Sequence, residues 1–105
     1  MVVLNHLEPQ RVFHFFEELC AIPHGSGNTK AVSDWLVDFA KARGLRYVQD
    51  QLNNVVIFQD AAPGYESAEP VILQGHMDMV CEKEPGCTKD MAVDGLDLVL
   101  EGDTV

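Results

Sequence analysis

The sequence predicts an α/β fold in which two helices are followed by a mixed sheet, all within one domain. Three observations support this prediction. The chain has 105 residues, which is close to the usual size of a single domain. Two amphipathic helical patterns occupy its first 44 residues, and short runs rich in β-branched residues follow them. Apolar residues make up 47% and charged residues 23%, as in an ordinary globular chain.

The first predicted helix begins near Pro9 and ends before Pro23. Proline suits the first turn of a helix, where its missing N–H costs nothing, and it cannot continue a helix at the other end. Apolar residues at i, i+3, i+4, i+7 and i+8 form one face that we expect to be buried. These residues are Val12, Phe15, Phe16, Leu19 and Cys20.

The second predicted helix follows a polar, glycine-containing loop at residues 24–28. Asn28 or Thr29 is suited to cap its first turn, and Arg43 and Gly44 mark its end. The expected buried stripe of this helix again has helical spacing. It consists of Val32, Trp35, Leu36, Phe39 and Ala40.

Strand patterns occupy the second half of the chain. Residues 45–50 and 55–58 flank Asn53-Asn54 and predict a β-hairpin. Residues 70–73 are apolar without alternation, which is typical of a strand covered on both faces. At residues 96–100 leucines alternate with other residues, as in an edge strand.

Charge and hydropathy exclude several classes of function. The net charge is −10, and residues 59–105 hold eleven acidic side chains against two basic ones. Such a chain would repel phosphate backbones, so we expect no nucleic-acid partner. Apolar runs are too short to cross a membrane, and the start lacks a secretory signal. A cytoplasmic protein is therefore expected, in which Cys20 belongs to the core while Cys81 and Cys87 are reduced loop cysteines.

The most informative chemistry follows the apolar run at residues 71–73. Gly75 allows the backbone to turn or to approach another segment closely, and His76 and Asp78 come next. In extended chain, residues two apart point to the same side. A neutral imidazole is a good zinc ligand, and a carboxylate that accepts its other N–H fixes its tautomer. By spacing alone, the pair could instead make only local hydrogen bonds at the end of a strand.

Several other residues are candidates for metal binding or for contact with substrate. Cys81 and Cys87 could join His76 at a metal ion, but they lack the usual spacing of zinc-binding cysteines. His24 could contact substrate or, as we prefer, help to cap the second helix. Three further acids could bind cations weakly but have no fixed ligand spacing, namely Asp94, Asp97 and Asp103.

Residues 74–80, Gln-Gly-His-Met-Asp-Met-Val, resemble the first metal-ligand segment of the dinuclear zinc peptidases. More closely, the chain is similar to the aminoacyl-histidine dipeptidases of that group. Further stretches carry the same resemblance in the same order, so it extends over nearly the whole chain. They are residues 7–16, 22–29, 50–55 and 88–90.

The resemblance implies that residues 1–105 are the N-terminal part of a metallopeptidase catalytic domain, which in the family is interrupted by a smaller lid domain. His76 would bind one of two zinc ions, with manganese or cobalt as alternatives. Asp78 would be a catalytic residue, an aspartate whose carboxylate orients this histidine. The bridging aspartate and the general base of the family would follow residue 105.

The full-length protein would then hydrolyse Xaa-His and other dipeptides through a metal-activated water, as a homodimer, and this chain alone would be inactive. The alternative function is a non-catalytic structural or interaction domain that stays folded by docking to a partner.

Overall fold

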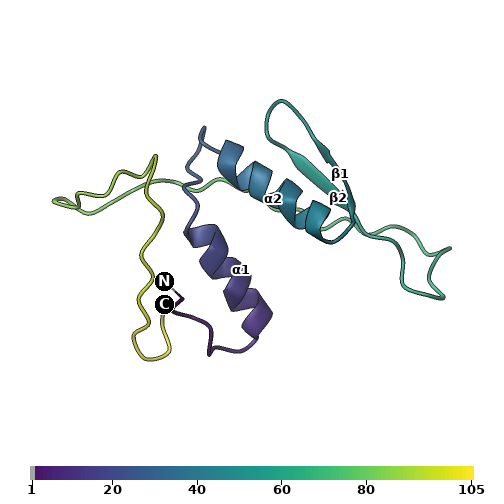
Figure 1. Cartoon of the computed structure of the whole chain (residues 1–105), viewed down its shortest axis with the longest axis horizontal. Helices are drawn as coiled ribbons and strands as arrows, with labels where there is room; N and C mark the ends of the chain where they lie inside the picture. The colour runs from purple at the N-terminus through teal and green to yellow at the C-terminus, as the bar shows by residue number, and fades with distance from the viewer. Residues whose placement is uncertain (1) are drawn as a thin grey trace. The chain divides into compact units, whose positions relative to one another are not determined.

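A computed structural model describes residues 2–105 and contains two helices followed by one β-hairpin (Figure 1). The helices are α1 (Gln10–Cys20) and α2 (Lys30–Ala42), and the strands are β1 (Arg46–Gln49) and β2 (Val55–Phe58). The predicted α/β class and the order of these elements are confirmed. The chain divides into two compact units: the first comprises residues up to Val32 together with Asp78–Val105, and the second comprises Ser33–Met77.

Helix α1 belongs to the first unit and begins directly after Pro9, as predicted. The carbonyl of Pro9 accepts hydrogen bonds from the N–H groups of Val12 and Phe13, at 3.1 and 3.3 Å. Cys20 is buried, but Val12 and Phe16 are 61% and 45% exposed. The expectation that this whole face is buried is therefore wrong. The reason is that Phe16 and Cys20 border an open cavity of about 710 Å³ rather than a packed sheet.

The predicted edge strand at residues 96–100 does not form among the described residues. Its side chains still alternate, with Leu96, Leu98 and Leu100 half-buried between more exposed neighbours. The segment is attached to α1 by the N–H of Leu96, which donates to the carbonyl of Cys20 at 2.8 Å. A strand requires a hydrogen-bonded neighbour along its length, and no other described segment supplies that ladder here.

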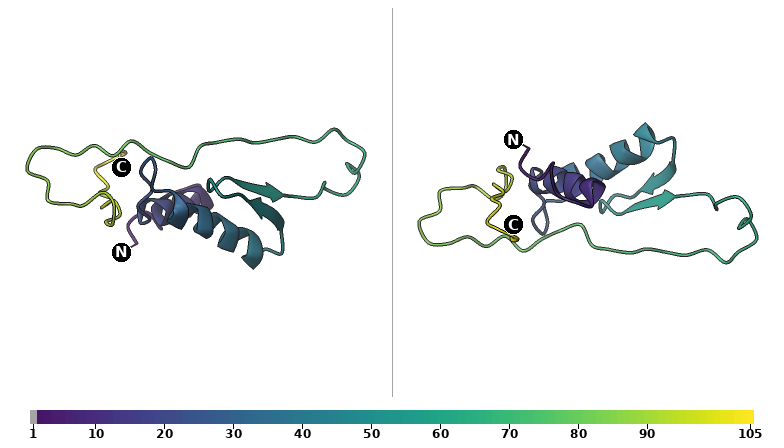
Figure 2. Two further views of the ribbon diagram at one scale, coloured as in Figure 1. Left: turned by 90° about the horizontal axis from the view of Figure 1, so that it is seen from above. Right: turned by 90° about the horizontal axis from the view of Figure 1, so that it is seen from below.

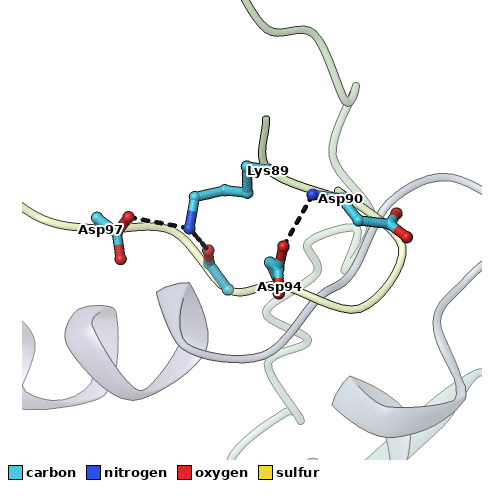
Figure 3. A network of polar contacts seen from close by, with 5 residues as sticks. Lys89, Asp90, Asp94 and Asp97 are labelled. Carbon is cyan, nitrogen blue, oxygen red and sulfur yellow. Dashed lines mark hydrogen bonds and ion pairs between the residues drawn. The ribbon is translucent and has the colours of Figure 1, made fainter. Parts of the chain in front are cut away.

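A small polar network organises the loop that precedes this segment (Figure 3). The ammonium group of Lys89 donates to the carbonyl oxygen of Gly95 at 2.7 Å and lies 3.0 Å from Oδ2 of Asp97. Oδ2 of Asp94 accepts the N–H of Asp90 at 2.8 Å. The carboxylates of Asp94 and Asp97 thus hold the loop together.

The predicted hairpin forms in the second unit. β1 and β2 pair antiparallel in the register Arg46↔Phe58 to Gln49↔Val55, and they make up a two-stranded sheet. The carboxylate of Asp50 ties the turn, because it accepts the N–H groups of Leu52 and Asn54 at 2.9 Å each. Of the expected mixed sheet, only this antiparallel part is present in residues 2–105.

Helix α2 lies alongside the hairpin (Figures 1 and 2). Val32 and Ala40 of its predicted stripe are buried and the other members are half-buried, which confirms the expected face. The fully buried Ser33 connects helix and hairpin: its hydroxyl donates to the carbonyl of Asn53 at 2.9 Å and accepts from Nε2 of Gln49 at 2.8 Å. Hydropathy did not identify this serine as a core residue.

Residues 59–77 continue the second unit as chain without helix or strand, visible as the long green trace in Figure 2. The strand expected at residues 70–73 is absent, and Val71, Ile72 and Leu73 are 83%, 89% and 94% exposed. A buried parallel strand needs neighbours on both sides and helices over both faces. The described residues supply neither, because β1 and β2 pair only with each other. No helix in residues 2–105 has the length and apolarity to cross a membrane.

Candidate metal-ligand segment

His76 and Asp78 lie in chain without regular secondary structure. His76 is exposed near the end of the second unit, and Asp78 is half-buried where the chain re-enters the first unit. The close approach expected at Gly75 is not observed, because a Cβ at this position would have no atom within 4 Å. Its φ angle is also not positive. Local glycine flexibility therefore does not explain how this segment is positioned.

The loop between the two helices positions Asp78 instead. Gly25 and Met79 form an isolated parallel bridge. In this bridge the N–H of Met79 donates to the carbonyl of His24 at 3.0 Å, and the N–H of Ser26 donates to the carbonyl of Met79 at 3.1 Å. The hydroxyl of Ser26 then donates to Oδ2 of Asp78 at 2.6 Å. Three hydrogen bonds from one loop thus hold two consecutive residues.

Gly25 lies close to the segment that follows Asp78. Gly25 is buried, and a Cβ there would lie 2.5 Å from Sγ of Cys81 and 3.9 Å from the carbonyl oxygen of Met79. A Cβ here would therefore require the Cys81 side chain to move, whereas the backbone of Met79 would remain at an ordinary contact distance.

His24 does not cap helix α2. Its Nδ1 lies 2.6 Å from the carbonyl oxygen of Ile22, so this nitrogen carries the proton and donates. The neighbouring Asn28 closes the loop, since its N–H donates to the carbonyl of Gly25 at 2.8 Å and its side-chain amide donates to the carbonyl of Ala92 at 3.0 Å.

The described residues offer part of a metal site but not a complete one. Residues 2–105 contain no group of three His, Cys, Asp or Glu side chains placed to hold a metal ion. All three cysteines are free, with Cys20 buried and Cys81 and Cys87 exposed. The alternative in which Cys81 and Cys87 complete a site with His76 therefore finds no support. An exposed imidazole fits the donor chemistry of zinc, but a catalytic zinc needs about three protein ligands.

Sequence reasoning missed Ser26. A serine in a polar loop is an ordinary residue, and no local pattern indicates that it contacts an acid 52 positions away. The only available signal was the sequence His24-Gly25-Ser26-Gly27, which belongs to the stretch that resembles the dipeptidases.

Comparisons with known proteins agree with this resemblance. No family model matches the chain. The chain is 33% identical over all its 105 residues to cytosol non-specific dipeptidase from Escherichia coli, of which it spans 22%. Its structure resembles the crystal structure of aminoacylhistidine dipeptidase from Vibrio alginolyticus, with a TM-score of 0.89 and 32% identity. That match covers 96% of this chain and 21% of the other.

The chain therefore spans about a fifth of the length of the relatives it matches. The sequence match extends over the whole chain, so the aligned region includes residues 22–29 and 74–80. The resemblance predicted from the motifs is confirmed, because this chain is similar in sequence and in structure to proteins named as cytosol non-specific and aminoacylhistidine dipeptidases.

Proposed function

We propose that the whole protein is a metal-dependent dipeptidase that hydrolyses Xaa-His and other dipeptides, and that residues 1–105 form the N-terminal part of its catalytic domain. The observation that carries this proposal is the match of the entire chain, in sequence and in structure, to two proteins named as dipeptidases. The name of the first relative refers to the cytosol, and we propose the cytoplasm for this protein also. A homodimer is the proposed assembly of the whole protein.

In this proposal His76 supplies one metal ligand. This residue is exposed to solvent, so a metal ion could reach it without unfolding of the surrounding chain. A zinc ion, or manganese or cobalt in its place, would supply Lewis acidity at the scissile carbonyl. The remaining ligands and the general base would come from residues of the whole protein other than 2–105, which hold no group of three suitable side chains. The 105-residue chain alone is accordingly proposed to be inactive.

Asp78 has a different role in this proposal, because it would orient the imidazole of His76. A carboxylate that accepts the second N–H of a ligating imidazole fixes the tautomer and raises the basicity of the ligand. A half-buried position and a bond to a loop hydroxyl suit a carboxylate that must keep one orientation.

The test compares three variants of the full-length protein. We expect His76→Ala to lower kcat for an Xaa-His dipeptide by orders of magnitude and to reduce the zinc retained after dialysis. We expect Asp78→Ala to weaken zinc affinity by about 10–100-fold. His14→Ala is the matched control, because this exposed histidine lies on α1, where it faces Glu18 at 3.3 Å and its ring packs on Phe15. Unchanged turnover and zinc content in His76→Ala would refute the proposal.

A non-catalytic interaction domain is the second candidate function. The observation that favours it is the exposed apolar run Val71 to Leu73, which a binding partner could cover. The same three variants separate the two functions. In an interaction domain, His76→Ala and His14→Ala would have equal, small effects on stability, and neither preparation would hydrolyse dipeptides.

A further inference from the structure

Ser26 makes a short hydrogen bond to the acid that the proposed function pairs with His76. Its hydroxyl lies 2.6 Å from Oδ2 of Asp78. This separation falls in the range of O–H···O⁻ bonds to an ionised carboxylate, about 2.5–2.7 Å, which are roughly twice as strong as bonds between neutral groups. The two residues are 52 positions apart, so the contact is a product of the fold.

The backbone around this contact is held independently of the hydroxyl. The N–H groups of Met79 and Ser26 make the bridge between the loop and the segment, at 3.0 and 3.1 Å. Gly25 is buried between them, with Sγ of Cys81 where a Cβ would otherwise lie. Removal of the Ser26 hydroxyl would therefore leave the two segments joined. What it would remove is the hydrogen bond from this hydroxyl to Oδ2 of Asp78.

A carboxylate is planar, so a fixed position for Oδ2 restricts the direction of Oδ1. For a carboxylate that orients a metal ligand, this direction decides how well the imidazole is aligned. Without the bond from Ser26, the carboxylate of Asp78 would be held less tightly, and the imidazole that it orients would be aligned less well. The cost of such misalignment falls on metal binding and on turnover.

We propose that Ser26 is a positioning residue: its hydroxyl holds the carboxylate of Asp78 in the orientation that this acid needs to align His76. This inference rests on the proposed function, because it assigns Ser26 a role only through Asp78 and His76. It assigns Ser26 no contact with substrate or metal.

The experiment uses the full-length protein and measures both the dissociation constant for zinc, by competition with a chelator, and the kinetic constants for an Xaa-His dipeptide. Ser26→Ala should weaken zinc binding and lower kcat, each by about tenfold, with little change in KM. Tenfold is the low end of the range, about 10–100-fold, for mutation of residues that support a metal ligand. Ser26→Thr keeps a hydroxyl and should restore both quantities to within about threefold of the wild type.

Asn28→Ala is the control for a purely structural role of the loop. Asn28 lies in the same loop as Ser26, but its side-chain amide donates to the carbonyl of Ala92, at 3.0 Å, and not to Asp78. We expect this variant to lower the melting temperature while zinc affinity and kcat stay unchanged. If Ser26→Ala fails to fold, Ser26→Cys provides a side chain of similar shape with a weak donor, and it should show the same losses.

The outcomes distinguish the two proposals. If Ser26→Ala, or Ser26→Cys in its place, keeps wild-type zinc affinity and kcat while Asp78→Ala loses both, the positioning role is wrong and the dipeptidase function stands. If His76→Ala also keeps both, the proposed function itself is wrong. Equal losses in Ser26→Ala and Asn28→Ala would likewise overturn the positioning role, because they would indicate a general effect of the loop.

Discussion

Gly95 lies directly against the backbone of Ala21, such that a Cβ on Gly95 would be 2.5 Å from the carbonyl oxygen of Ala21 and 2.9 Å from its Cα. The next residue, Leu96, donates its N–H to the carbonyl of Cys20 at 2.8 Å. This contact attaches the last part of the chain to the end of α1, and therefore holds the first unit together.

The first prediction follows from this contact. Gly95→Ala places a methyl group against backbone atoms that cannot move aside as a side chain can, so we expect a loss of about 1–3 kcal/mol in the free energy of unfolding. Urea denaturation of the 105-residue chain measures it. Gly75→Ala is the control, because a Cβ there meets no atom within 4 Å. Equal losses in the two variants would contradict the predicted clash.

The second prediction concerns pH and the hairpin turn. Hydrogen bonds from the side chain and backbone N–H of Asn54, and from the N–H of Leu52, hold the pKa of Asp50 below its ordinary value of 3.8. The ionised carboxylate therefore stabilises the folded turn. This stabilisation is complete above about pH 3.8 and is lost as the pH falls through the lower, folded-state pKa.

An NMR titration checks the prediction through the carboxyl carbon of Asp50 and the amide protons of Leu52 and Asn54. All three signals should change together, with a midpoint below 3.8. Asp50→Ala should abolish the change at both amides, whereas Asp60→Ala, at an exposed acid beyond β2, should not. A midpoint at or above 3.8 would show that the carboxylate does not hold the turn.

The third prediction concerns the exposed run Val71 to Leu73. We expect Ile72→Lys to have opposite effects in two contexts, because Ile72 is 89% exposed here but its sequence is typical of a strand covered on both faces. In the 105-residue chain the added charge should reduce self-association. In the full-length protein it should lower stability by more than about 2 kcal/mol, since the ammonium group would be buried without a partner.

Sedimentation velocity and thermal unfolding measure these two effects. Ser67→Lys adds the same charge to the exposed connection before the run, and it should change neither quantity appreciably. If Ile72→Lys leaves the full-length protein as stable as Ser67→Lys does, then residues 70–73 are not a buried strand in the whole protein either.

Local sequence patterns were sufficient to predict the helices and the hairpin of this protein. The helices and the hairpin were predicted to within a few residues, because helical spacing, capping residues and turn residues act over about four positions. Val32 and Ala40 were correctly assigned to the core for the same reason. The family resemblance also came from sequence, through the segment at residues 74–80. The roles of His76 and Asp78 remain predictions.

Contacts between residues far apart in the chain could not be predicted from these local patterns. The contact of Ser26 with Asp78, the burial of Ser33 between α2 and the hairpin, and the packing of Gly95 on Ala21 depend on the path of the whole chain. The exposure of residues 70–73 was not predicted either. A strand pattern shows that a segment can pair, but it does not supply the neighbouring strands. Hydropathy records the preference of a side chain for burial, and burial itself requires other atoms to cover it.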